Sequence, residues 1–98
     1  MYQIKYSRRF SAELSEIVEY LSTHYSVDVA SNTAESIMSS ISLLAKFPRI
    51  GVLRAFNVSL ATEYHLLVSG HYFVYYSIHL NEIRIDGIKD SRQKYYSI

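Results

Sequence analysis

The chain has 98 residues, of which 49% are hydrophobic and 19% charged, and it contains ten tyrosines but only three glycines and one proline. This length fits one domain, expected over residues 1–98, and the apolar share excludes a disordered tail. A formal net charge of +1 excludes a strongly basic nucleic-acid footprint, and the absence of cysteine excludes disulfides and thiolate chemistry.

The first ten residues combine a strand-like alternation with three cations. Lys5, Arg8 and Arg9 stand among apolar residues that form no continuous apolar run, so no secretory signal is expected. No apolar run is long enough to span a bilayer either. We therefore expect a cytoplasmic protein that does not bind membranes.

A strand followed by a helix opens the chain. Residues 2–6 alternate apolar and polar side chains, the period of a half-buried strand. Ser7 then offers a hydroxyl for the N-cap of a helix predicted over residues 8–24. This helix is amphipathic because its apolar side chains recur at helical spacing: Phe10, Leu14, Ile17, Val18 and Leu21.

A second amphipathic helix is predicted from Asp28, its expected N-cap, to a stop before Pro48. Its apolar face is formed by Ala30, Ala34, Ile37, Met38, Ile41, Leu44 and Ala45. Gly51 supplies a turn after the proline. Residues 49–61 show neither the helical nor the strand periodicity of apolar side chains and are predicted to form a loop.

Three alternating runs complete the chain, at residues 64–68, 72–78 and 83–89, with turns at 69–70 and 80–81. The element order is therefore β-α-α-β-β-β. We predict an α+β fold in which a helical hairpin packs on one face of a four-stranded antiparallel sheet. Alternation in the central run directs Tyr72, Val74, Tyr76 and Ile78 toward the helices, and Phe73 and Tyr75 toward the opposite face.

Four segments, in this order, resemble the RelE/ParE superfamily of toxins. Residues 2–7 are similar to its first strand, and Phe-Pro-Arg-Ile-Gly at 47–51 resembles the FPxxG turn after its second helix. Tyr-Phe-Val-Tyr-Tyr-Ser-Ile at 72–78 resembles its central strand, and residues 83–93 resemble its last strand and basic tail. The resemblance covers essentially the whole chain.

The resemblance implies the toxin of a type II toxin–antitoxin system, a growth inhibitor without cofactor or metal that a cognate antitoxin neutralises. The target is left open. ParE-like members bind DNA gyrase, whereas RelE-like members are endoribonucleases that cut mRNA on the ribosome. A degenerate toxin that acts only as an antitoxin-binding co-repressor is a further alternative. A homodimer and a toxin–antitoxin hetero-oligomer both remain open.

The chain has few of the residues that RNA cleavage would need. Metal-free cleavage requires an acid, a base and fixed positive charge on the phosphorane. The resemblance places the usual strand arginine at Phe73, and the basic positions of the preceding strand near Glu63 and His65. His65 and Arg92 are the catalytic candidates if the chain is a nuclease, but the depletion favours the ParE-like branch.

The remaining candidates are residues that would bind the target or the antitoxin. Phe73 and Tyr75 are large aromatics on a face without helices, so we expect a tail, an antitoxin segment or a second subunit to cover them. Exposed helix faces and sheet edges are further candidates for antitoxin contact. Cations and a tyrosine near the C-terminus are further candidates for binding the target or the antitoxin, and the alternative is that they are only solvated surface residues. They are Arg49, Arg54, Lys89, Lys94 and Tyr95. No two of the four histidines have helical ligand spacing, so no metal site is expected.

Overall fold

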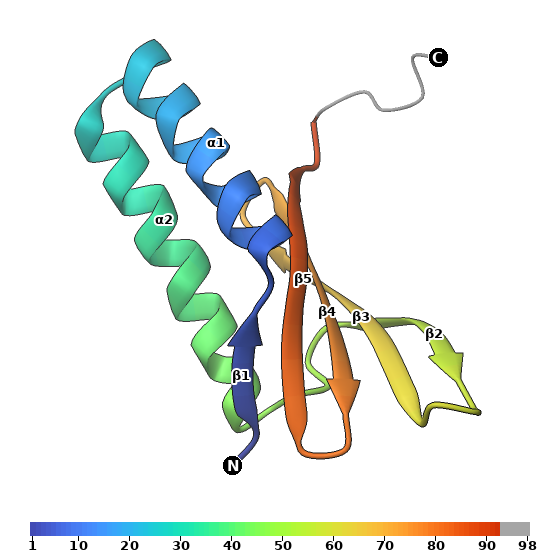
Figure 1. Ribbon diagram of the computed structural model, residues 1–98. Helices are drawn as coiled ribbons and strands as arrows, with labels where there is room; N and C mark the ends of the chain where they lie inside the picture. The colour runs from blue at the N-terminus through green and yellow to red at the C-terminus, as the bar shows by residue number, and fades with distance from the viewer. Residues whose placement is uncertain (93–98) are drawn as a thin grey trace, which may run out of the picture.

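A five-stranded sheet in the order β1-β5-β4-β3-β2 runs through the protein, whose computed structural model describes residues 1–92 (Figure 1). Strands β2 to β5 form an antiparallel meander, and β1 pairs in parallel with β5. The predicted α+β class is thereby confirmed, with one parallel pair added. The elements are β1 (Gln3–Tyr6), α1 (Arg8–His24), α2 (Val27–Ser42), a 3-10 turn η1 (Leu43–Ala45), β2 (Val52–Asn57), β3 (Thr62–Ser69), β4 (Tyr72–His79) and β5 (Glu82–Asp90).

Strand β2 corrects the prediction of a loop over residues 49–61, which is wrong for Val52–Asn57. Every residue of this strand is exposed, so its sequence carries no alternation between a buried and a solvated face. Pairing with β3 alone makes it a strand. Its register shifts between Leu53 and Ala55, which leaves Arg54 as the extra residue of a bulge.

Serine hydroxyls cap both helices. Ser7 Oγ accepts a hydrogen bond from the Phe10 amide at 2.9 Å, as predicted, and Ser26 Oγ accepts one from the Val29 amide at 3.1 Å. Helix α2 therefore begins at Val27, and the prediction of Asp28 as its cap is wrong. Asp28 lies in the first turn, where its negative charge is favourable to the helix dipole.

The core lies between the helix pair and one face of the sheet, where apolar side chains from both helices meet those of β3, β4 and β5. The alternate residues of β4 predicted to face the helices are all buried, which confirms the predicted face of that strand. The buried cluster consists of Phe10, Ile37, Ile41, Leu44, Leu67, Tyr72, Val74, Tyr76, Ile78, Ile83, Ile85 and Ile88. Figure 1 shows the helices beside β1 and β5, with β2 at the far end of the sheet.

The edge of β5 is covered in two parts. Its first half, Glu82 to Ile85, pairs with β1. Beyond Ile85, side chains at the start of α1 bind the backbone of β5. Ser7 Oγ donates to the Asp86 carbonyl at 3.0 Å, and Glu13 Oε1 accepts from the Ile88 amide at 2.9 Å. Side chains of a helix therefore replace the missing neighbour strand.

Among residues 1–92, no helix combines the length and the apolar character needed to cross a bilayer.

Candidate functional site

The face of the sheet that the helices leave open carries a row of large side chains. Leu66 pairs with Tyr75 and Val68 pairs with Phe73, so all four point to this face. Tyr75 exposes 38% of its surface and Phe73 is half-buried. Phe73 and Tyr75 therefore lie where the sequence predicted them.

A hollow of about 530 Å³ lies on this face, with Tyr75 but not Phe73 in its lining. Two tyrosines of neighbouring strands and three cations from different elements line it, together with an aspartate, a glycine and two residues of the strands beneath. The bulge of β2 contributes Arg54, helix α1 contributes Arg9 and β5 contributes Lys89. The full lining is Arg9, Arg54, Tyr64, His65, Tyr75, Tyr76, Asp86, Gly87 and Lys89. Cations beside tyrosine rings suit a partner with carboxylates or phosphates and flat apolar groups.

Glu13 holds two of the three cations of the hollow. Its carboxylate lies 3.2 Å from Arg9 Nε and 2.6 Å from Lys89 Nζ. Burial raises the pKa of Glu13, but hydrogen bonds from Lys89, Ile88 and Arg9 outweigh it and leave that pKa below its ordinary value. Within residues 1–92, no carboxylate forms an ion pair with Arg54. The charge of Arg54 is therefore the most available to a partner.

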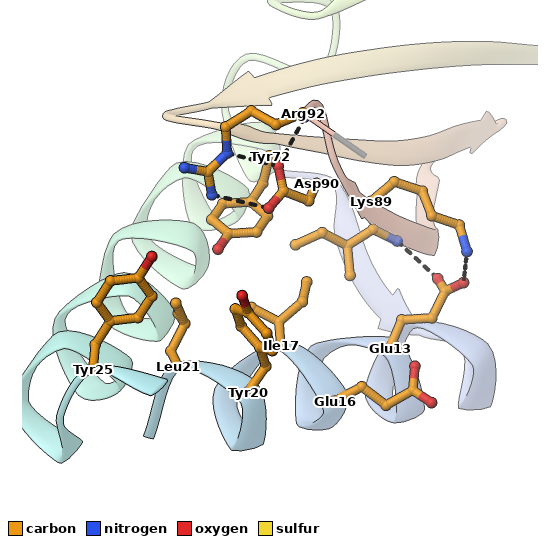
Figure 2. A pocket seen from close by; sticks show the side chains of 11 residues that line it. Glu13, Glu16, Ile17, Tyr20, Leu21, Tyr25, Tyr72, Lys89, Asp90 and Arg92 are labelled. Atoms are coloured by element: carbon orange, nitrogen blue, oxygen red, sulfur yellow. Dashed lines mark hydrogen bonds and ion pairs between the residues drawn. The ribbon is translucent and has the colours of Figure 1, made fainter. Parts of the chain in front are cut away.

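A second hollow, of about 560 Å³, separates α1 from the end of β5. Figure 2 shows Tyr20 and Leu21 of α1, and Tyr25 directly after this helix, facing Tyr72 and Arg92 across the hollow. Arg92 forms an ion pair with Asp90, at 2.9 Å, and this hydrogen-bonded pair lowers the pKa of Asp90. The hollow is thus aromatic on its helix side and carries a neutralised ion pair on its strand side.

A chain of polar contacts ties the turn after α2 to β3. Arg49 donates hydrogen bonds to both carboxylate oxygens of Glu63, the shortest at 2.7 Å, and His65 Nε2 lies 2.9 Å from Glu63 Oε1. The hydrogen bonds from Arg49, and then from His65, lower the pKa of Glu63 to about 2. The ring of His65 stacks on Tyr76 with centroids 5.2 Å apart.

The catalytic candidates His65 and Arg92 are not brought together. His65 is only 4% exposed, and it pairs in register with Tyr76 on the side of the sheet that holds the core. Arg92 follows Asp90, which pairs with Tyr72 at the other end of β4. Four residues of strand, roughly 13 Å, separate those two rows. The two side chains therefore belong to different structural features.

The other predicted residues divide between these features. Arg54, Tyr75 and Lys89 meet at the hollow of the open face. Arg49 is engaged by Glu63. Lys94 and Tyr95 lie outside the described residues.

Sequence reasoning missed Arg9 and Tyr64 as lining residues of the open-face hollow. Tyr64 had a signal, because its alternation with Leu66 placed both on one face of a strand. Arg9 had none, since helical periodicity does not reveal that the first turns of α1 wrap the edge of β5. Glu13 escaped notice for the same reason.

The comparisons with known proteins agree with this architecture. Residues 4–95 match the family model described as ParE toxin of type II toxin–antitoxin system, parDE. A chain of the chromosomal ParDE TA system from P. aeruginosa has a similar fold, with a TM-score of 0.75 at 18% identity over 92% of this chain and 96% of that one. No curated protein sequence matches. The predicted resemblance to the RelE/ParE superfamily is confirmed.

Proposed function

Because the chain belongs to the ParE toxin family of type II toxin–antitoxin systems, we propose that it is a cytoplasmic growth inhibitor held inactive by a cognate antitoxin. We further propose that it acts by binding DNA gyrase and not by cutting RNA. The open face of the sheet is the surface offered to the target.

The observation that carries this proposal is the composition of the open-face hollow. Tyr64 and Tyr75 lie there with Arg9, Arg54 and Lys89, an arrangement suited to holding a partner's acidic and apolar groups. The one imidazole at the hollow belongs to His65, whose ring nitrogens face Glu63 and the Gly51 carbonyl. Because both ring nitrogens of His65 have partners within the protein, this supports binding over a cleavage reaction in which His65 acts as the acid or base.

The test is inducible expression without an antitoxin, followed by parallel assays of supercoiling by purified gyrase and of mRNA integrity in a ribosome-containing extract. We expect growth arrest, inhibited supercoiling and intact mRNA. Tyr75→Ala should weaken inhibition about tenfold or more, as for truncation of an aromatic anchor in an interface. Tyr25→Ala, at an exposed tyrosine outside this hollow, is the matched control and should stay as inhibitory as the unchanged protein.

A ribosome-dependent endoribonuclease is the second candidate, and the same hollow favours it: three cations and two tyrosines can also hold phosphates and stacked bases. It predicts rapid mRNA cleavage with supercoiling unaffected. It also predicts that His65→Ala and Arg92→Ala relieve toxicity while the protein stays folded. Normal growth on expression would instead indicate a co-repressor without a target.

A further inference from the structure

The chain around β2 leaves an unusual amount of apolar surface uncovered. Within residues 47–60, here called the β2 segment, seven large apolar side chains each expose at least half of their surface: Phe47, Ile50, Val52, Leu53, Phe56, Val58 and Leu60. Scattered apolar residues are ordinary on a protein surface, whereas many exposed large apolar side chains within one short stretch of chain favour a contact site. Figure 1 shows why the fold leaves it bare, since β2 lies at the end of the sheet away from both helices.

The backbone of β2 is also available. As the last strand in the order β1-β5-β4-β3-β2, it pairs among residues 1–92 with β3 on one side only. Its outer edge therefore presents amide and carbonyl groups to an incoming strand. Leu53 and Phe56 lie on the helix side of the sheet, opposite His65 and Glu63, whereas Val52 shares the open face with Leu66. A strand added here would meet apolar side chains on both faces.

Charge distinguishes between the possible occupants. Residues 46–62 contain Lys46, Arg49 and Arg54 but no aspartate or glutamate. Arg49 is held by Glu63, which leaves Arg54 on the edge strand to attract a carboxylate. A second copy pairing antiparallel about the middle of β2 would bring two Arg54 side chains together, and like charges across strands are unfavourable. The complementary occupant is an acidic segment of another protein.

The bulge at Arg54 also favours a segment of another protein over a second copy of this chain. Bulges interrupt the regular spacing of edge groups and so discourage indiscriminate strand pairing. An extended segment that matches the irregular spacing can still pair on either side of the bulge, with its apolar side chains against Leu53 and Phe56. Specificity for one partner and resistance to self-association then come from the same feature.

We propose that β2 is the docking edge for an extended segment of the antitoxin, which carries apolar side chains at alternate positions and an aspartate or glutamate opposite Arg54. This inference rests on the proposed function, because it requires that the chain has an antitoxin. It assigns that partner to the β2 edge and leaves the target to the open-face hollow, which Arg54 borders from one side.

The first experiment measures affinity for the cognate antitoxin, to be sought as the product of a short open reading frame beside this gene. Leu53→Asp should weaken binding roughly 30-fold or more, and Arg54→Glu roughly tenfold, the scale of central interface residues. The matched control is Leu80→Asp, an exposed leucine in the β4–β5 turn at φ 55°, where aspartate is tolerated. The control should bind within about threefold of the unchanged protein. Far-ultraviolet circular dichroism of each variant verifies that it is folded.

The second experiment measures amide hydrogen exchange of residues 52–57 in the free toxin and in the complex. A strand added to the edge should slow exchange at the outward amides of β2 by about tenfold or more. If the complex forms but β2 exchanges as fast as before and Leu53→Asp binds normally, the docking edge is wrong while the proposed function stands. If neither complex nor growth arrest occurs, both fail. A free toxin that is dimeric, and becomes monomeric on Leu53→Asp, would assign the edge to a second copy and overturn the proposal.

Discussion

The two edge regions of the sheet differ in whether their outer backbone groups are covered. Past the end of β1, the outer groups of β5 are satisfied from within the chain, by the Ser7 hydroxyl and the Glu13 carboxylate of α1. At β2 no such cover exists among residues 1–92, and all six residues of the strand are exposed. The comparison separates an edge whose backbone groups are covered by the chain itself from an edge whose backbone groups stay exposed among residues 1–92.

Exposure of β2 does not make it loosely attached. The Tyr76 hydroxyl donates to the Pro48 carbonyl at 2.7 Å and accepts from the Gly51 amide at 3.1 Å. Tyr76 is itself buried in the core, and burial raises the pKa of its phenol. The turn that leads into β2 is therefore pinned to the centre of the protein, which holds the exposed strand in a fixed position.

The largest effect is expected at Gly51, in the turn that leads into β2. A Cβ on Gly51 would lie 2.6 Å from the Leu66 carbonyl oxygen and 2.7 Å from the Tyr76 hydroxyl, and neither the backbone nor the buried ring can easily move. Gly51→Ala should therefore lower the free energy of unfolding by about 3 kcal/mol, as measured by urea denaturation.

Gly87→Ala is the matched substitution at the covered end. Its Cβ would lie 2.8 Å from Glu13 Oε1, the tip of a flexible side chain that can swing aside. We expect a loss of about 1 kcal/mol, mostly the displaced hydrogen bond to Ile88. Equal effects at Gly51 and Gly87 would show that the turn before β2 is no more rigid than the edge of β5.

A pH dependence should follow from the network that supports β2. The folded pKa of Glu63 is about 2, below the ordinary value of about 4.3. A lowered pKa means that Glu63 stabilises the fold fully above the unfolded value, and that this contribution is lost as the pH falls from about 4.3 toward 2. The contribution should be roughly 1 kcal/mol, because the Arg49 side chain is 54% exposed and the ion pair is screened by solvent.

Glu63→Gln provides the control for that titration, because glutamine keeps the shape of the side chain and has no proton to gain. In urea denaturation between pH 6 and pH 2, the variant should be less stable than the unchanged protein at pH 6 and should lose less stability on acidification. Parallel pH profiles for the two proteins would contradict the assignment to Glu63.

The same contrast between the ends explains what the sequence could predict. Helices, the strands of the core and the inward residues of β4 follow from periodicity, because one face of each is buried and the other is not. Strand β2 has no buried face, so Val52 to Asn57 read as a loop. Pairing with β3 is a tertiary interaction, and no local pattern records it.

The candidate site was predictable only where it lies on a regular strand. Phe73 and Tyr75 were placed on the open face by alternation alone. The meeting of Arg9, Arg54 and Lys89 depends on a bulge and on a helix that wraps an edge, neither of which has a signature in this sequence. His65 was named as a catalytic candidate because of its residue type. Its position on β3 instead directs its ring toward Tyr76.

The smallest expected effect concerns the cover over β5. Glu13→Gln keeps an oxygen that can accept from the Ile88 amide but removes the charge that faces Lys89 and Arg9. It should cost about 0.5 kcal/mol of stability and leave exchange of the Ile88 amide slow. Glu13→Ala removes the acceptor as well, and should cost about 1 kcal/mol and speed that exchange. If the two variants behaved alike, charge alone would hold α1 against β5, and the edge amide would be no better protected there than at β2.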